Sequence, residues 1–178
     1  MKLRIVTAML LAAALLRTEI SHAEDAAPPA YPLDVIPDKM PFATPYGAPI
    51  SLQRAQALVQ AAVAEATKRG WAMNVAVVDS GTNLVAFSRM DGAQLASIAV
   101  SQHKARTAAK YRRPTKAFEE AVQKSGFNYV MTLDDVVASR GGIPLIEDGK
   151  LIGAIGCSGG SGSQDEVICA AAAATINK

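Results

Sequence analysis

Residues 89–116 carry apolar side chains at spacings of three and four, which predicts an amphipathic helix. An Asp91-Gly92 turn opens this segment, and Pro114 ends the helix after about five turns, because proline cannot continue one. The pattern predicts a buried stripe, formed by Leu95, Ile98, Ala99, Ala105, Ala108 and Ala109. At about 100° per residue, four polar side chains share one flank of that stripe: His103, Arg106, Thr107 and Lys110. Val100 and Tyr111 lie further round on a weakly apolar strip, so we expect a ligand or subunit contact here.

Three more helices are expected around this segment. Ser51 is a good N-cap for an apolar helical pattern, which stops at Gly70 as helices commonly do at glycine. A short helix is predicted over residues 115–124. A closing helix should begin near Ser163, with acidic residues in its first turn and an alanine-rich body.

The strand patterns predict two hairpins. One covers residues 71–88 around the polar turn 80–83, and the other covers residues 142–156 around Asp148-Gly149-Lys150. Residues 127–135 fit neither a helix nor a strand pattern. Helices and hairpins in this order predict an α+β domain with an antiparallel sheet.

The N-terminal part of the chain differs from this domain. Residues 1–23 have a basic start, an apolar run too short to span a bilayer and small residues before a cleavage point after Ala23, the features of a signal peptide. Residues 24–49 hold seven prolines and predict an extended arm. Residues 50–178 then suffice for one domain. We therefore expect a periplasmic or secreted protein.

Cleavage changes the charge balance. The chain has 18 basic and 16 acidic residues, of which three and one lie in residues 1–23, so the remainder carries 15 of each. A chain without net positive charge lacks the general electrostatic attraction to nucleic acid or to an acidic membrane surface. We expect neither partner after the signal peptide is removed.

Export also reduces the candidate metal ligands. His22 leaves with the signal peptide, so His103 is the only histidine of the mature chain, which excludes a multi-histidine metal site. Cys157 falls in a predicted strand and Cys169 in a predicted helix. For these cysteines we favour separate burial, with an intramolecular disulfide as the alternative.

Two further segments have simple structural interpretations. Residues 158–163, SGGSGS, lead into a helix N-terminus that could hold an anion, but they lack the lysine of a P-loop and suit a flexible turn. Asp79-Ser80-Gly81 resembles a turn more than a catalytic acid. A serine hydrolase is disfavoured because residues 156–160 miss the Gly-x-Ser-x-Gly pattern.

The polar flank of the helix over 89–116 is the main candidate site. His103 could ligate a haem iron or transfer a proton, and Arg106 or Lys110 could pair with carboxylates. The alternative is a solvated basic helix face with an incidental histidine. The residue types alone do not choose between them.

Several motifs together resemble the GlcG/HbpS family, which includes extracellular haem-binding proteins and the C-terminal domain of PduO-type proteins. The resemblance covers nearly all of residues 50–178. It rests on Val77–Gly81, Phe87–Gly92, Lys104–Ala108, Arg113-Pro114-Thr115, Gly141–Pro144, Gly153–Gly156 and Gln164-Asp165.

The resemblance implies a profilin-like α+β fold, with helices on an antiparallel sheet of about five strands, and assembly into homo-oligomers. It also implies binding of haem or a related tetrapyrrole, and haem degradation as a further activity. Thr107 matches a family threonine implicated near the cofactor. Some members use an N-terminal histidine as iron ligand; the mature chain has none there, and His103 is the histidine able to replace it.

These observations predict a secreted or periplasmic homo-oligomer that binds haem or a similar small ligand. His103 is the expected iron ligand, with Arg106, Thr107 and Lys110 around it. The alternative is an isomerase or lyase acting on a small organic acid, with His103 as general base.

Overall fold

The structure, a computed structural model, describes residues 32–177. Residues 32–38 belong to one compact unit, with the 3-10 helix η1 (Pro32–Asp34), and residues 39–177 to a second. The predicted signal peptide, residues 1–23, lies outside the described residues. No helix within residues 32–177 is long and apolar enough to cross a membrane.

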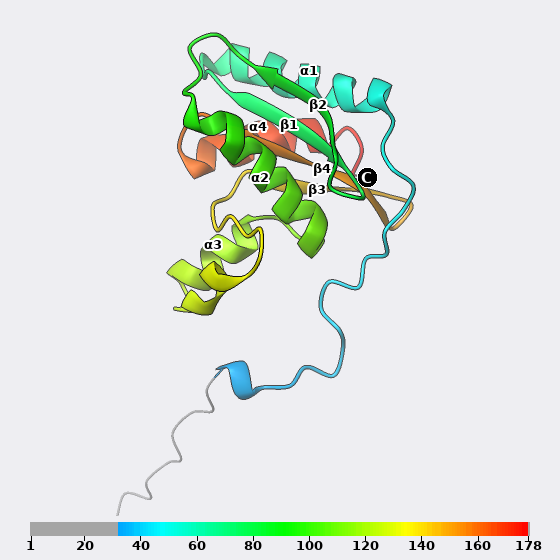
Figure 1. Ribbon diagram of the computed structural model, residues 1–178, viewed down its shortest axis with the longest axis vertical. Coiled ribbons are helices and arrows are strands. Elements are labelled where there is room, and N and C mark those ends of the chain that lie inside the picture. The colour runs from blue at the N-terminus through cyan, green and yellow to red at the C-terminus, as the bar shows by residue number, and fades with distance from the viewer. Residues whose placement is uncertain (1–31, 178) are drawn as a thin grey trace, which may run out of the picture. The chain divides into compact units, whose positions relative to one another are not determined.

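A four-stranded antiparallel sheet with the order β2-β1-β4-β3 forms the centre of the second unit (Figure 1). Both predicted hairpins are present, and the second turns tightly because Asp148 and Gly149 have φ angles of 48° and 70°. In chain order the strands are β1 (Asn74–Asp79), β2 (Leu84–Arg89), β3 (Gly142–Glu147) and β4 (Lys150–Ser158).

Helices cover both faces of this sheet. One cluster of buried side chains joins α1 and α4 to one face, and a second joins α2 to the other, so α2 lies in front of the strands and α4 behind them in Figure 1. The predicted caps of α1 are confirmed: the Ser51 hydroxyl accepts the Arg54 N–H, and Gly70 is left-handed at φ 68°. The helices are α1 (Leu52–Arg69), α2 (Ala96–Tyr111), α3 (Lys116–Gln123), η2 (Asn128–Thr132) and α4 (Gly162–Ala173).

The α+β class is confirmed, but the expected count of about five strands is wrong for the described residues, which form four. The ambiguous segment 127–135 contains η2 instead of a strand. The outer edge of β3 leaves no place for another strand there. Pro144 has no N–H, the Asn177 amide donates to the Pro144 carbonyl, and the Ile146 N–H donates to the Asn177 side chain.

The predicted core stripe of α2 is partly wrong. Ala105, Ala108 and Ala109 are buried as expected, but Leu95 is 69% exposed and Ala99 is also exposed. The face turned to the sheet instead uses small residues because the helix lies almost on the strands. A Cβ added to Gly156 would come within 2.1 Å of the Ser101 carbonyl oxygen, so larger side chains do not fit between them.

The last part of the proline-rich arm packs on the C-terminal end of α2. The Tyr46 hydroxyl donates to the Lys110 carbonyl at 2.8 Å, and the Arg112 guanidinium donates to the Thr44 carbonyl at 3.1 Å. The Arg113 guanidinium lies 3.6 Å from the ring centre of Phe42. These contacts favour a fixed position for α2 relative to the arm.

Candidate functional site

One face of α2 is open to solvent and combines apolar and basic side chains. Leu95 and Ala99 are exposed in its N-terminal half, His103 is exposed in the middle, and Arg106 is partly exposed one turn later. At about 100° per residue these side chains lie along one stripe, opposite the buried face of the helix. We call the stripe of Leu95, Ala99, His103 and Arg106 the α2 face.

A small cavity of about 70 Å³ adjoins the α2 face. His103 and Arg106 line one side of it, and three residues of the segment before β3 line the other: Asp135, Val136 and Val137. Within residues 32–177 the Arg106 guanidinium has one hydrogen-bond contact, a long one of 3.5 Å with the Gln102 side chain. Its charge therefore remains available to an incoming anion.

Thr107 does not share this open face, because its side chain is fully buried. The hydroxyl donates to the Asp135 carbonyl at 2.6 Å and accepts the Val137 N–H at 3.1 Å. Thr107 thus holds the loop that forms the far wall of the cavity.

Lys110, the remaining predicted site residue, is exposed but already paired. Its ammonium contacts the carboxylate of Asp135. Hydrogen bonding within this pair lowers the pKa of the Asp135 carboxyl and raises the pKa of the Lys110 ammonium, so both stay charged. Asp135 was not predicted as a partner of Lys110, because it lies in the segment 127–135, which has no helix or strand pattern.

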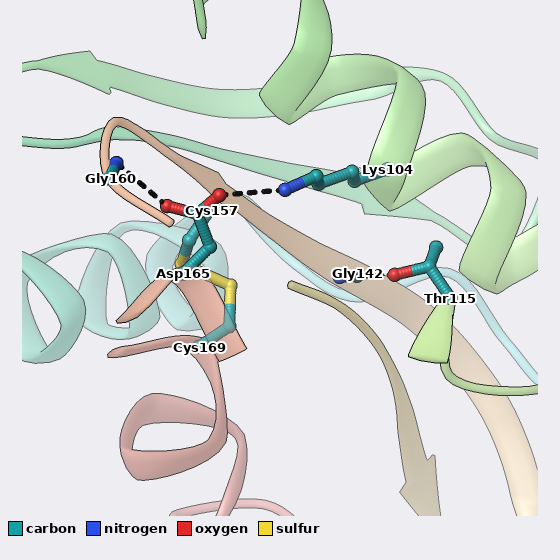
Figure 2. The surroundings of a disulfide bond; sticks show 7 residues. All are labelled: Lys104, Thr115, Gly142, Cys157, Gly160, Asp165 and Cys169. Carbon is teal, nitrogen blue, oxygen red and sulfur yellow. Dashed lines mark hydrogen bonds and ion pairs between the residues drawn. A yellow bond between two sulfur atoms is a disulfide. The ribbon is translucent and has the colours of Figure 1, made fainter. Parts of the chain in front are cut away.

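The structure also contains a buried ion pair that sequence reasoning missed. Lys104, next to His103 in the chain, points into the protein and contacts Asp165 of α4 at 2.7 Å; the two side chains are 2% and 3% exposed (Figure 2). The other carboxylate oxygen of Asp165 accepts the Gly160 N–H at 3.0 Å. The pair joins α2 to the start of α4 across the end of β4. Lys104 and Asp165 both belong to the motifs that carry the family resemblance, and this membership is the sequence signal that could have pointed to the pair.

Among the described residues, no group of three or more His, Cys, Asp and Glu side chains is placed to hold a metal ion. The chemistry available on the α2 face is therefore that of one accessible imidazole, a guanidinium and an apolar surface. Such a set could hold an iron porphyrin through the His103 imidazole, or move a proton.

Residues 50–174 match a family model described as "Haem degrading protein HbpS-like". The chain belongs to this family.

Individual relatives agree with this assignment. The chain is similar to Protein GlcG of Escherichia coli K12, with 43% identity over 109 residues, which are 61% of this chain and 81% of GlcG. Among solved structures it is similar to a PduOC–haem complex, with 33% identity and a TM-score of 0.66 over 73% of this chain and 96% of that one. A double mutant of Streptomyces reticuli HbpS gives 28% identity and a TM-score of 0.68 over 85% and 100%.

A disulfide in this HbpS-like domain corrects the preference for separately buried cysteines. Cys157 of β4 and Cys169 of α4 are bonded, with their Cα atoms 5.7 Å apart, and both are fully buried (Figure 2). The bond was not predictable from the two elements alone, because it requires α4 to pack with Cys169 directly over Cys157. It fixes α4 on the sheet close to the Lys104–Asp165 pair.

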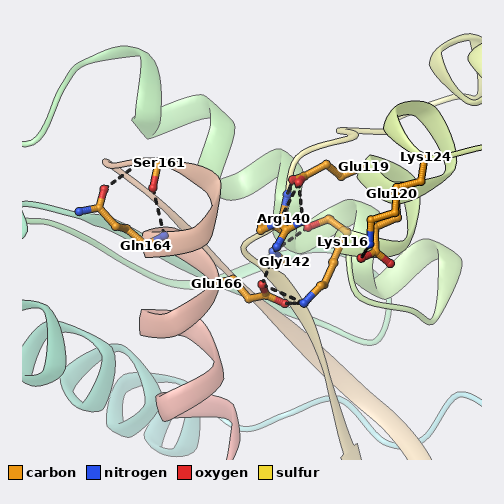
Figure 3. A network of polar contacts seen from close by, with 10 residues as sticks. Lys116, Glu119, Glu120, Lys124, Arg140, Gly142, Ser161, Gln164 and Glu166 are labelled. Carbon is orange, nitrogen blue, oxygen red and sulfur yellow. Dashed lines mark hydrogen bonds and ion pairs between the residues drawn. The ribbon is translucent and has the colours of Figure 1, made fainter. Parts of the chain in front are cut away.

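Surface charges of the HbpS-like domain hold the segment before β3 in place (Figure 3). Both the side chain and the backbone N–H of Arg140 donate to the Glu119 carboxylate of α3, each at 2.7 Å. Glu166 of α4 contacts Arg140 at 3.4 Å and Lys116 at 3.2 Å. Partial burial of Glu119 opposes its ionisation, but the hydrogen bonds from Arg140 outweigh this and lower its pKa. The network thus ties the C-terminal end of the segment 124–141 to α3 and α4.

Proposed function

We propose that this chain is an exported protein that binds haem or a closely related tetrapyrrole on the α2 face, with His103 as the iron ligand. The observation that carries the proposal is the position of His103. It is exposed between the apolar Leu95 and Ala99 on one side and the Arg106 guanidinium on the other. A haem presents the same sequence of features: an apolar ring, an iron centre and carboxylate side chains.

The residues fit haem as a surface ligand. The cavity beside His103 holds about 70 Å³, whereas pockets that enclose a drug-sized ligand usually measure about 300–1,000 Å³. The porphyrin ring would therefore lie over the apolar part of the α2 face. Haem, when bound, supplies an iron centre with its redox and oxygen chemistry. This chain would supply the His103 imidazole, the apolar surface and the Arg106 guanidinium that binds a propionate carboxylate.

Arg106 is the proposed partner of a propionate. Its guanidinium offers paired donors to a carboxylate, and its one hydrogen bond to the described part of the chain, with Gln102, is long. Lys110 has a weaker claim because Asp135 already occupies its ammonium. Thr107 contributes from below by holding the cavity loop.

Two of the comparisons support haem as the ligand class. The family description names haem degradation, and the similar PduOC structure is a haem complex. The Cys157–Cys169 disulfide supports export to the periplasm or beyond, since such bonds persist in oxidising compartments.

A second candidate function is an isomerase or lyase that uses His103 as a general base. The small cavity favours it, because its volume suits a small organic acid better than a porphyrin and His103 lines it. The family description and the PduOC complex, however, name haem and not an organic acid. We therefore place haem binding first.

Titration with haemin separates the two. We expect the purified wild type to shift the Soret band of haemin to that of a histidine-ligated species, and His103→Ala to lose this shift. Arg106→Ala should weaken binding by about 10- to 100-fold, the equivalent of about 1–3 kcal/mol for a charged hydrogen bond, and Arg106→Lys should recover part of it.

Lys124→Ala is the matched control, because Lys124 is an exposed cation away from the α2 face, and its removal should leave binding unchanged. Equal haemin affinity and an equal spectrum for wild type and His103→Ala would contradict the proposal.

A further inference from the structure

The two edges of the sheet are treated differently. The edge strand β3 is closed by Pro144 and by the two hydrogen bonds of the Asn177 side chain. Closure of this kind is what natural sheets use to prevent pairing with other chains. On the opposite edge strand, β2, neither a proline nor a side-chain hydrogen bond closes the outer side among the described residues; its one irregularity is a bulge at Val85, between the pairs Val77–Ala86 and Val78–Leu84.

The backbone of β2 presents unpaired groups along its outer side. The Met90 N–H donates to the Met73 carbonyl, and the register then places Val75 opposite Ser88. Hydrogen-bonded pairs alternate along an antiparallel ladder, so Ser88 points its backbone groups toward β1. Those of its neighbours Phe87 and Arg89 point outward. Within residues 32–177 the outward N–H and C=O groups of Phe87 and Arg89 form no hydrogen bond.

A groove of about 540 Å³ runs between this open strand and α1. Two exposed glutamines, Gln56 and Gln60, line it together with Leu52, which is 55% exposed. At about 100° per residue, the flank of α1 above the groove carries no charge. All four charged residues of α1 fall on the other flank: Arg54, Glu65, Lys68 and Arg69.

The outward backbone groups call for an extended segment as the occupant. The chain's own proline-rich arm is a poor donor. Between Pro32 and Pro49 no more than four residues separate one proline from the next, and proline interrupts a ladder of hydrogen bonds. β2 itself is a good donor, because residues 84–88, LVAFS, contain neither proline nor charge.

Pairing of β2 with a second β2 is also free of charge conflict. In an antiparallel pair centred on Phe87, Arg89 lies beside Val85 of the second copy, where the bulge ends the regular pairing, so the two arginines stay apart. The uncharged flanks of the two α1 helices then face each other above the joined strands. A self-complementary patch of this kind is the requirement for a two-fold symmetric dimer.

We propose that β2 and the uncharged flank of α1 form the interface with a second copy of this chain, which joins two sheets into one. The inference adds an interface to the oligomeric state that the family resemblance implies, and it is independent of haem binding. α2 covers the other face of the sheet, so the α2 face stays open in such a dimer.

Sedimentation of the ligand-free protein tests the interface. Gln56→Arg places two like charges across the proposed two-fold axis, and we expect it to raise the dimer dissociation constant about 10-fold or more. Ala57→Arg is the matched control: it adds the same charge on the same turn, but Ala57 lies on the other side of α1, where it lines a different groove with Thr175 and Ile176. Its dissociation constant should equal that of the wild type.

Hydrogen exchange of the Phe87 and Arg89 amides gives the second readout. Both should be protected at concentrations where the wild type is dimeric and exchange fast in Gln56→Arg. An oligomer that survives Gln56→Arg with fast-exchanging amides would overturn this interface while leaving oligomerisation intact. A wild type that stays monomeric at tens of micromolar would overturn it as well. Neither result bears on haemin binding, which is measured separately.

Discussion

The buried Lys104–Asp165 pair offers the sharpest test of how this fold is held together. Asp165→Asn keeps an oxygen to accept the Gly160 N–H but removes the charge that balances the Lys104 ammonium. Because both side chains are almost fully buried, water cannot replace the lost partner. Breaking a buried pair from one side typically costs about 3–5 kcal/mol. A domain of this size has about 5–15 kcal/mol in total, so a large share of its stability is at stake.

Urea unfolding followed by Trp71 fluorescence, with the disulfide intact, measures this loss. We expect Asp165→Asn and Lys104→Met each to lower the free energy of unfolding by about 3–5 kcal/mol. The double variant removes both charges and should lie within about 2 kcal/mol of the wild type, since no uncompensated charge remains.

Lys116→Met is the control for this series. Lys116 also pairs with α4, through Glu166, but its side chain is 41% exposed. Such a pair contributes about 0–1 kcal/mol, so its loss should be small. If Asp165→Asn cost no more than Lys116→Met, the buried pair would not be an anchor and the reasoning from burial would be wrong.

Three further predictions concern other contacts. Replacing both Cys157 and Cys169 by alanine should lower the free energy of unfolding by about 3 kcal/mol, the entropy of closing a loop of this length, whereas dithiothreitol should not destabilise that variant. Thr107→Val should cost about 1–3 kcal/mol and speed hydrogen exchange at the Val137 amide, because that N–H loses its acceptor. The carboxyls of Glu119 and Asp135 have lowered pKa values in the folded state, so their contribution is present above their ordinary values of 4.5 and 3.8 and is lost as the pH falls through the folded values. The melting temperature should therefore be steady down to about pH 5 and fall below it, less steeply in Glu119→Gln.

The parts of the fold that followed from sequence are those governed by local rules. Ser51 and Gly70 bound α1 because a hydroxyl satisfies free N–H groups and glycine accepts a left-handed φ. Asp148-Gly149 produced the second hairpin for the same kind of reason. Likewise Asp79 forms a turn, in which its carboxylate accepts the N–H groups of Gly81 and Asn83.

The parts that did not follow depend on contacts between distant segments. Leu95 was predicted as a core residue because its spacing fits the apolar pattern. The sheet, however, presents Gly142 and Gly156 to α2, and the helix lies too close to it for large side chains to fit between them. Adding a Cβ to Gly142 would bring it within 2.3 Å of the Lys104 carbonyl oxygen. The pairing of Cys157 with Cys169, and of Asp135 with Lys110, likewise required the tertiary structure.

The buried pair and the candidate site are linked by the geometry of one helix. Consecutive residues of an α-helix point about 100° apart, so a helix that buries Lys104 against Asp165 must turn His103 away from that pair. The close approach of α2 to Gly142 and Gly156 fixes the same rotation independently. Lys104 is thus a charged residue that the hydrophobic pattern does not predict to be buried, yet its burial orients the helix. The exposed imidazole of the α2 face follows from that orientation.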